Sequence, residues 1–252
     1  MTTPESPIIQ IERRKAIAYI ISALILALAI GGGLVKVGTG FASRSDNGIV
    51  VTGSARTEAV ADNAVWTLSV SLSRPKVADA VAKVSNDVEA VTKYLADGGI
   101  PSEALTLGPV STYGQEEWVN GNSTGRILNY RASRDITVRT KDVQLVSKLS
   151  QGIGDLLQTG VPINNYGPQY YISTLSDLRP KLLGEAMKDA RVRAEAITKA
   201  AGGSVGAVIN VKSGPFQVTT QDSTQTADYG AYDTSTIEKT VTSTVSVTFK
   251  TK

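Results

Sequence analysis

An uncharged apolar stretch, AIAYIISALILALAIGGGLV, runs from Ala16 to Val35 and constrains this chain more than any other feature. A helix rises about 1.5 Å per residue, so roughly 20 apolar residues match the hydrocarbon thickness of a bilayer. A helix also pairs its own backbone polar groups, which lipid cannot do. We therefore predict one membrane-spanning helix over residues 16–35.

The charges on either side of this stretch predict its orientation. Residues 13–15 are Arg-Arg-Lys, whereas Lys36 and Arg44 are sparser on the other side. Because basic residues are retained on the cytoplasmic side, residues 1–15 are expected to be a cytoplasmic tail. The rest of the chain is then extracytoplasmic, in the periplasm if the membrane is a bacterial inner membrane.

A cleaved signal peptide is the alternative interpretation of the same stretch. It also begins with basic residues, and Ala27-Leu28-Ala29 resembles a cleavage site. The apolar region of a signal peptide is usually about 7 to 15 residues, however, which is shorter than this one. A lipoprotein anchor is excluded because the chain has no cysteine.

Composition excludes several classes of function. The chain has no histidine and no cysteine. Ser-His-Asp triads, histidine zinc sites, thiolate catalysis and disulfides are therefore impossible. The net charge is only +3, and the basic residues are interspersed with acidic ones, so no surface for nucleic acid is indicated.

The remainder of the chain divides into a spacer and a folded domain. Residues 36–48 are rich in Gly, Ser and polar residues, which predicts a flexible spacer. Residues 49–252, about 200 in number, suffice to bury a hydrophobic core. Hydrophobic periodicity predicts strands at 49–52, 64–73, 105–118, 127–139, 163–173, 205–219 and 237–249, and helices at 77–95, 142–158 and 176–201.

Several local details are predicted within these elements. Gly53 is expected to mark a bulge or turn, and residues 120–125 a polar turn between two long strands. Arg134 interrupts an otherwise apolar strand face. The predicted core-facing residues are Ala64, Trp66, Leu68, Val70 and Leu72; Val77, Val81, Val84, Val88, Val91 and Leu95; Leu128, Tyr130, Ala132, Ile136 and Val138; Leu145, Val146, Leu149, Ile153, Leu156 and Leu157; Leu183, Met187, Ala190, Ala194 and Ile197; Ile237, Val241, Val245, Val247 and Phe249.

Acidic residues offer two candidate sites, and neither has the spacing that chemistry needs. Glu116 and Glu117 lie beside Trp118, but neighbouring residues of a strand point to opposite faces, so their carboxylates do not converge. Asp222, Asp228 and Asp233 share a polar loop, yet their spacing does not fit an EF-hand. We predict no catalytic, cofactor-binding or metal-binding residues.

Aromatic and small residues suggest two interaction sites. Tyr166, Tyr170 and Tyr171 would form a platform for carbohydrate or peptide if they shared a face, although tyrosines at the edge of a core have the same pattern. Within the predicted membrane helix, Ala23, Ala27 and Gly31 are spaced four apart, which allows two helices to approach closely. Chance placement of common residues is the alternative for this second pattern.

The order of several short strings resembles the SIMPL domain family of bacteria. The resemblance covers residues 49–250, and the apolar stretch matches the membrane-anchored branch of that family. Its strings are Val51-Thr52-Gly53, Ala61-Asp62-Asn63-Ala64-Val65-Trp66, Tyr170-Tyr171-Ile172-Ser173-Thr174-Leu175 with Arg179-Pro180, the helix with Ala186, Ala190-Arg191 and Ala194, residues 203–206, Gly214-Pro215-Phe216 and the closing Val/Thr strand. The long loop at residues 221–236 departs from the family pattern.

The resemblance implies an α+β fold, with helices packed on antiparallel sheet, in an exported domain. Family members resemble one another in forming homo-oligomers, some of them rings, and are associated with envelope or oxidative stress defence. No catalytic residues are established for the family, so none is transferred.

The predicted function is a non-catalytic, homo-oligomeric scaffold or stress-protective protein of the bacterial envelope, anchored in the inner membrane by residues 16–35. The alternative is a module that binds envelope carbohydrate or peptide, either at a cleft near Tyr166–Tyr171 or at the hairpin around Trp118. An enzyme that uses only Asp, Glu, Lys or Tyr side chains is a third interpretation, for which the sequence offers no positive sign.

Overall fold

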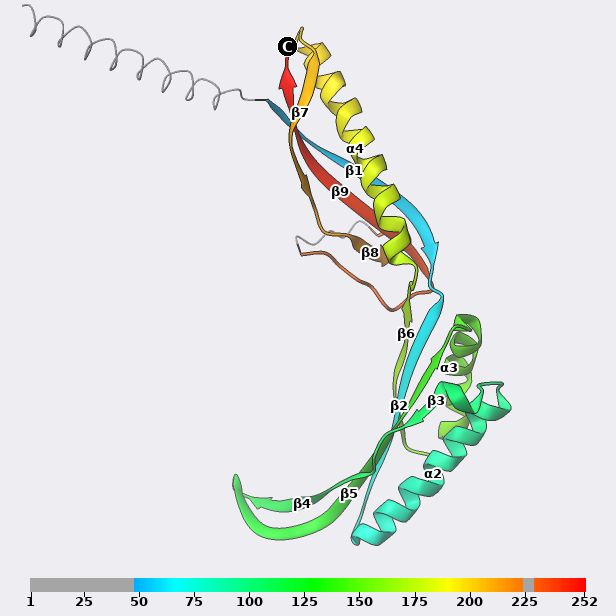
Figure 1. Ribbon diagram of the computed structural model, residues 1–252. Coiled ribbons are helices and arrows are strands. Elements are labelled where there is room, and N and C mark those ends of the chain that lie inside the picture. Colours follow the sequence, from blue (N-terminus) through cyan, green and yellow to red (C-terminus); the bar gives the residue numbers. More distant parts are fainter. Residues whose placement is uncertain (1–47, 224–228) are drawn as a thin grey trace, which may run out of the picture. The chain divides into compact units, whose positions relative to one another are not determined.

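The computed structural model describes residues 48–223 and 229–252 (Figure 1). The predicted tail, the predicted membrane helix at 16–35 and all of the predicted spacer except Gly48 lie outside the described residues. Among the helices of the described part, none is both long and apolar enough to span a bilayer.

The described residues form two sheets and three α-helices, which confirms the predicted α+β fold class. One sheet has the strand order β1-β9-β7, with β8 also paired to β9, and the other has the order β3-β5-β2-β6, with β4 also paired to β5. The strands are β1 (Ile49–Val60), β2 (Asn63–Arg74), β3 (Leu105–Leu107), β4 (Ser111–Val119), β5 (Asn122–Thr140), β6 (Ile163–Tyr171), β7 (Val205–Ser213), β8 (Gln217–Thr220) and β9 (Glu238–Thr251). The helices are α2 (Val77–Asp97), α3 (Val143–Gln158) and α4 (Leu175–Ala200), with a short 3-10 helix at Ser102–Ala104.

The chain divides into two compact units. The first contains the described residues up to Val50 together with Ala194–Asn210 and Thr248–Lys252. In this unit the backbones of Ser204 and Lys252 exchange two hydrogen bonds of 2.9 Å, which hold the start of β7 to the end of β9. The second unit, Val51–Arg193 and Val211–Val247, contains the hydrophobic core clusters.

The main core of the second unit is built on β2. The predicted alternation is confirmed, because Ala64, Trp66, Leu68 and Val70 are all fully buried. The antiparallel pairing of β2 with β5 sets Trp66 opposite Val138, and Leu68 opposite Ile136. Trp66 also donates its indole N–H to Asn165 Oδ1 at 2.9 Å, so its polar atom is satisfied inside the core.

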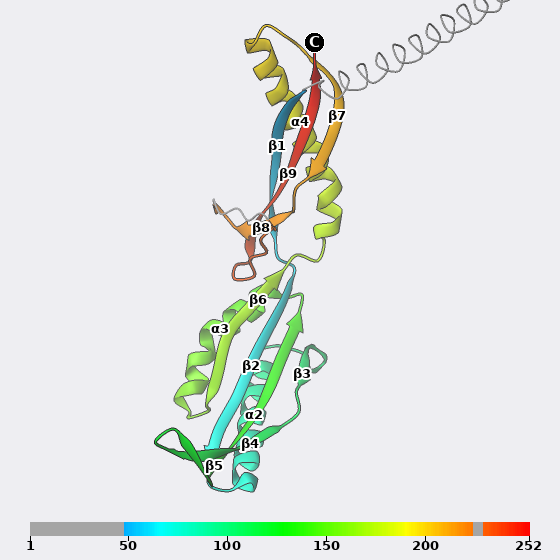
Figure 2. The same cartoon turned by 90° about the vertical axis from the view of Figure 1, so that its left-hand side faces the viewer.

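Helices α2 and α3 pack on the β3-β5-β2-β6 sheet and both belong to its core (Figure 2). Helix α2 contributes a predicted apolar stripe that includes Val84, Val88, Val91 and Leu95. Helix α3 begins at the predicted place because the Asp142 side chain accepts a hydrogen bond from Leu145 N. The 3.6-residue periodicity therefore predicted both helices, although Val77 and Leu157, which were predicted to face the core, are 41% and 43% exposed.

The hairpin between β4 and β5 differs from its prediction. Its connection is the two-residue turn Asn120-Gly121, with φ of 51° and 80°, and not the six residues 120–125. Two consecutive positive φ angles are typical of a type I′ turn, whose twist matches that of the flanking strands. The first of the two predicted strands is also divided into β3 and β4, and Leu128, predicted to face the core, is 44% exposed.

Gly53 and the buried face of α4 also differ from their predictions. Gly53 is a buried residue within the continuous strand β1, not a bulge or turn. A Cβ placed on it would lie 2.1 Å from Ala186 O, so glycine is required by the close approach of α4. The buried stripe of α4 is Leu182, Ala186, Ala190, Ala194 and Thr198, whereas Leu183 and Met187 are only half-buried and Ile197 is 52% exposed.

Candidate functional site

The far end of the β4–β5 hairpin lies outside the hydrophobic core. We call residues 111–129 the hairpin arm. Residues 111–113 of the arm pair with residues 131–133 of β5, which also pair with β2. The pairing of β2 with β5 ends at Arg74 opposite Tyr130, so from Asn129 to the turn β5 pairs with β4 alone (Figure 1). The arm exposes an unusual number of large apolar side chains: Tyr113 (55%), Trp118 (66%), Val119 (53%), Ile127 (46%) and Leu128 (44%).

A two-stranded hairpin is only marginally stable in water when it lacks a covering layer. Large apolar side chains exposed in one region of a folded protein are typical of an interaction surface. Residues Tyr113 and Trp118 combine large apolar area with a polar atom, which suits them to an interface. The arm is therefore the first candidate for a functional site.

The two carboxylates of the arm have separate partners. Ser123 Oγ donates a short hydrogen bond to Glu116, and Thr124 Oγ1 donates to Glu117 Oε2 at 3.1 Å. Arg126 lies 3.6 Å from the other oxygen of Glu117. Each carboxylate thus crosses the hairpin to its own hydroxyl, and the arrangement ties the two strands together.

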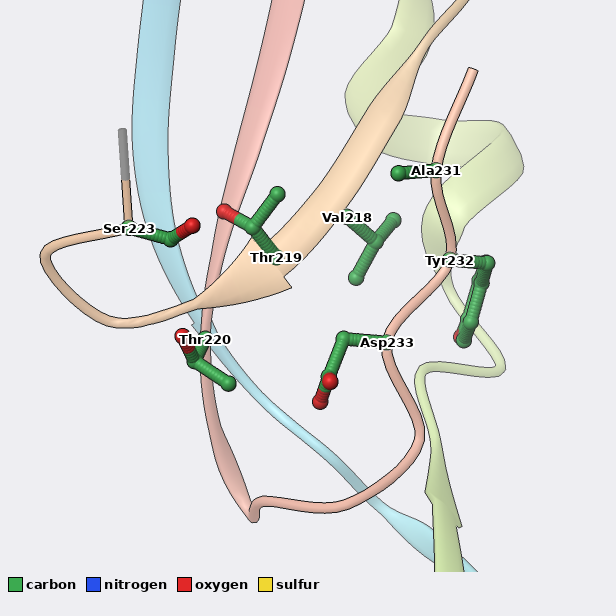
Figure 3. Close-up of a pocket in the computed structure, with 7 residues that line it drawn as sticks. All are labelled: Val218, Thr219, Thr220, Ser223, Ala231, Tyr232 and Asp233. Carbon is green, nitrogen blue, oxygen red and sulfur yellow. The ribbon is translucent and has the colours of Figure 1, made fainter. Parts of the chain in front are cut away.

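The acidic loop lies against β8. Residues Ala231–Asp233 run parallel to this strand, since Val218 N donates to Ala231 O and Asp233 N donates to Val218 O, both at 2.8 Å. A hollow of about 390 Å³ lies here; Figure 3 shows the residues that line it, which are Val218, Thr219, Thr220, Ser223, Ala231, Tyr232 and Asp233. Asp222 lines a neighbouring hollow, and Asp228 lies outside the described residues.

A buried lysine holds this loop in place. The Lys239 side chain is fully buried, and its Nζ donates to Asp233 O at 2.8 Å and lies 3.4 Å from Asp233 Oδ1. Burial lowers the pKa of Lys239, and the charge of Asp233 opposes this shift. For Asp233, burial raises the pKa, but the hydrogen bonds from Ser235 and the charge of Lys239 outweigh it and lower the pKa overall. The Lys239 amine is shielded from solvent and binds Asp233. This contact fixes one end of the segment 233–238 to the start of β9.

The burial of Lys239 was not predicted from the sequence. The alternation of the last strand contains one indication of it. Positions 239 and 243 fall on the predicted inward face, but they hold polar residues and were not predicted to be buried. In the structure Lys239 and Ser243 are both buried among the apolar residues of that face.

The structure brings together two of the three candidate tyrosines. Tyr166 is 79% exposed and lines, with Tyr170, a shallow hollow of about 500 Å³. Its other lining residues come from α3 and from residues 235–238: Ser147, Ser150, Gln151, Ser235, Thr236, Ile237 and Glu238, with Gly167 and Pro168 of β6. Tyr171 instead packs its ring 5.9 Å from that of Tyr232 and does not line this hollow.

Side chains that could hold a metal ion are scattered. Within residues 48–223 and 229–252, no three Asp or Glu side chains come close enough to form a metal site. Three of the acidic residues considered above, Glu116, Glu117 and Asp233, instead accept hydrogen bonds from neighbouring hydroxyl or amide groups.

Comparisons with known proteins identify a family but no function. The profile of the SIMPL family, described as a protein of unknown function (DUF541), matches residues 49–249. A search of curated proteins found no match. Among solved structures, an amidase of the hydantoinase/carbamoylase family from Burkholderia vietnamiensis is 14% identical, over 51% of this chain and 32% of that one.

The TM-score of that structural match is only 0.23, so it supports no conclusion about fold or activity. The family match, in contrast, spans nearly all of the described residues, and it confirms the resemblance found in the sequence. This chain belongs to the SIMPL family, whose function is unknown.

Proposed function

We propose that this protein is a membrane-anchored, extracytoplasmic domain that assembles with copies of itself into a non-catalytic scaffold of the bacterial envelope. The uncharged stretch at residues 16–35 supports the anchor, and the polar spacer supports a domain held at a distance from the bilayer. Protection of the envelope under stress is the physiological role that we infer from the family resemblance.

The hairpin arm is the observation that best supports self-assembly. Burial of a large apolar side chain is worth about 1.5–3 kcal/mol, so covering Tyr113 and Trp118 would recover several kcal/mol that the isolated chain loses. The separate partners of Glu116 and Glu117 favour a binding role for the arm over an acid-base role.

The mass of the full chain tests the proposal. We expect the protein to be recovered from the membrane fraction and to show, in mild detergent, a protein mass that is a multiple of 26.5 kDa by light scattering. The double variant Tyr113→Ser/Trp118→Ser should lower that mass because it removes the two exposed aromatic side chains of the arm.

Tyr229→Ser is the matched control, since Tyr229 is 99% exposed but lies outside the arm. It should leave the mass unchanged. A wild-type mass of one chain at all concentrations would contradict the proposal.

A second candidate function is favoured by the hollow beside Tyr166. An exposed aromatic ring next to hydroxyl and amide groups is typical of sites for sugars and peptides. A thermal shift with cell-wall fragments that Tyr166→Ala abolishes would support this binding function instead.

A further inference from the structure

The edge strands of the two sheets differ in how well they are covered. At β1, Ser54 N donates to Asp189 Oδ2 at 2.8 Å, and at β6, Tyr170 N donates to Thr234 O at 2.8 Å. The strands β4 and β7 each pair with one neighbour only, β5 and β9 respectively. Of the other edge strands that the structure describes, β3 has only three residues, whereas β4 and β7 each offer a nine-residue edge to another strand.

The strand β7 is an unusual edge. Its residues from Ala207 to Ser213 are all exposed, and they include Val208 (44%), Ile209 (46%) and Val211 (46%). Lys212 is its only charged residue. Natural edge strands are normally short or protected by charges, because unpaired backbone groups beside apolar side chains attract further strands. An edge of this composition is typical of a strand that has a partner.

The strands β4 and β7 complement each other in length and charge. Both contain nine residues. The charged residues of β4 are Glu116 and Glu117, whereas that of β7 is Lys212. Opposite charges on paired strands are stabilising and like charges are destabilising. If two β4 strands paired with each other, four carboxylates would lie close together and repel. The strand whose charge complements that of β4 is therefore β7.

We propose that β4 of one copy adds to the free edge of β7 of a second copy and extends its sheet. This inference rests on the proposed self-assembly and specifies which strands form the contact between copies. The contact joins two different surfaces, so each added copy still offers one free arm and one free β7 edge. Such a heterologous contact forms a closed ring or an open filament and does not stop at a symmetric pair.

Two variants of the full chain separate the two surfaces. The arm variant is Tyr113→Ser/Trp118→Ser, and the edge variant is Val208→Glu/Val211→Glu, which places carboxylates on β7 at exposed positions. Each variant and the wild type are prepared with two different affinity tags, extracted in mild detergent, and tested for co-purification of the two tagged forms. Circular dichroism confirms that each variant is folded.

We expect the arm variant to recover the edge variant at least tenfold better than either variant recovers itself. The mixed pair retains one intact arm and one intact β7 edge, whereas each self-pair lacks one of the two surfaces. Residues 16–35 are the same in the self-pairs and in the mixed pair. The self-pairs therefore measure any co-purification caused by association of these residues, and they are the matched control. Recovery of self-pairs that equals the mixed pair would overturn the β4–β7 contact.

A charge exchange provides a second measurement that does not need the apolar substitutions. Lys212→Glu should weaken co-purification of the two tagged forms, and Glu116→Lys/Glu117→Lys in the same chain should restore it. Lack of restoration would overturn the contact. If wild-type copies do not co-purify at all, the proposed self-assembly fails; if they do while both tests fail, only this contact is wrong.

Discussion

At the scale of single residues, Asp62 connects the segment between β1 and β2 to the segment that follows β6. Its Oδ1 accepts a hydrogen bond from Ser173 N at 2.7 Å, and its Oδ2 accepts one from Ser173 Oγ at 2.6 Å. Its own N–H donates to Tyr171 O at 3.0 Å. The hydrogen bonds from the Ser173 side chain and backbone lower the pKa of Asp62 below its ordinary value of 3.8. The connection from β1 to β2 is thereby fixed to the end of β6.

We expect Asp62→Asn to lower the free energy of unfolding by about 1 kcal/mol at pH 7, since it weakens two hydrogen bonds to a charged acceptor. The folded-state pKa is lower than the unfolded one, so the charged carboxylate stabilises the fold above pH 3.8. This contribution is lost as the pH falls through the folded-state pKa. Urea unfolding from pH 7 to pH 3 should therefore show the variant and wild type converging.

Asp135→Asn is the control for this experiment, because it removes one negative charge from an exposed position. It should change stability little at any pH. A difference between Asp62→Asn and wild type that stayed constant across the pH range would contradict the role given to the Ser173 contacts.

At the scale of elements, α4 packs closely on β1. A Cβ on Gly53 would lie 2.1 Å from Ala186 O and 2.4 Å from Ala190 N, both backbone atoms of α4 that cannot move independently. We expect Gly53→Ala to lower the free energy of unfolding by about 1–3 kcal/mol or more, because it forces the helix away from the strand.

Gly184→Ala provides the matched control on the same helix. A Cβ at this exposed position meets no atom within 4 Å, so the substitution should raise helix stability by about 0.5–1 kcal/mol. Denaturant unfolding of the two variants tests both expectations. Equal effects of the two substitutions would show that the α4–β1 contact is looser than described.

Elements with strong internal periodicity were predictable from the sequence. The burial of Trp66 and Leu68 in β2 and the apolar stripe of α2 follow from the local pattern, because each element presents one face to one core. The predictions were wrong where the conformation or burial of a residue depends on a segment distant in the sequence. Gly53 is determined by α4, and Leu128 is exposed because β2 ends before it can cover that part of β5.

The candidate site was less predictable than the fold. Trp118 was recognised as part of a hairpin, yet its exposure depends on where β2 stops pairing, which no local pattern records. The open edge of β7 depends on the strand order of its sheet, and the burial of Lys239 depends on the loop that contains Asp233. These features arise from long-range pairing and appear only when the chain is folded.

At the scale of the whole molecule, two surfaces of the described domain expose apolar side chains. The arm exposes Tyr113 and Trp118, and β7 exposes a run of apolar residues on a strand that, among the described strands, pairs with β9 alone. Both surfaces would be covered in an assembly held at a membrane by residues 16–35.

Hydrogen exchange of the full-length protein in mild detergent tests self-assembly through the arm most directly. In the assembled wild type, the backbone amides of Ser111–Val119 should exchange at least tenfold more slowly than in the Tyr113→Ser/Trp118→Ser variant, while those of the core strand β2 exchange at the same rate in both. Equally rapid exchange of the Ser111–Val119 amides in the two proteins would contradict the account, because the arm would then be exposed to water in both.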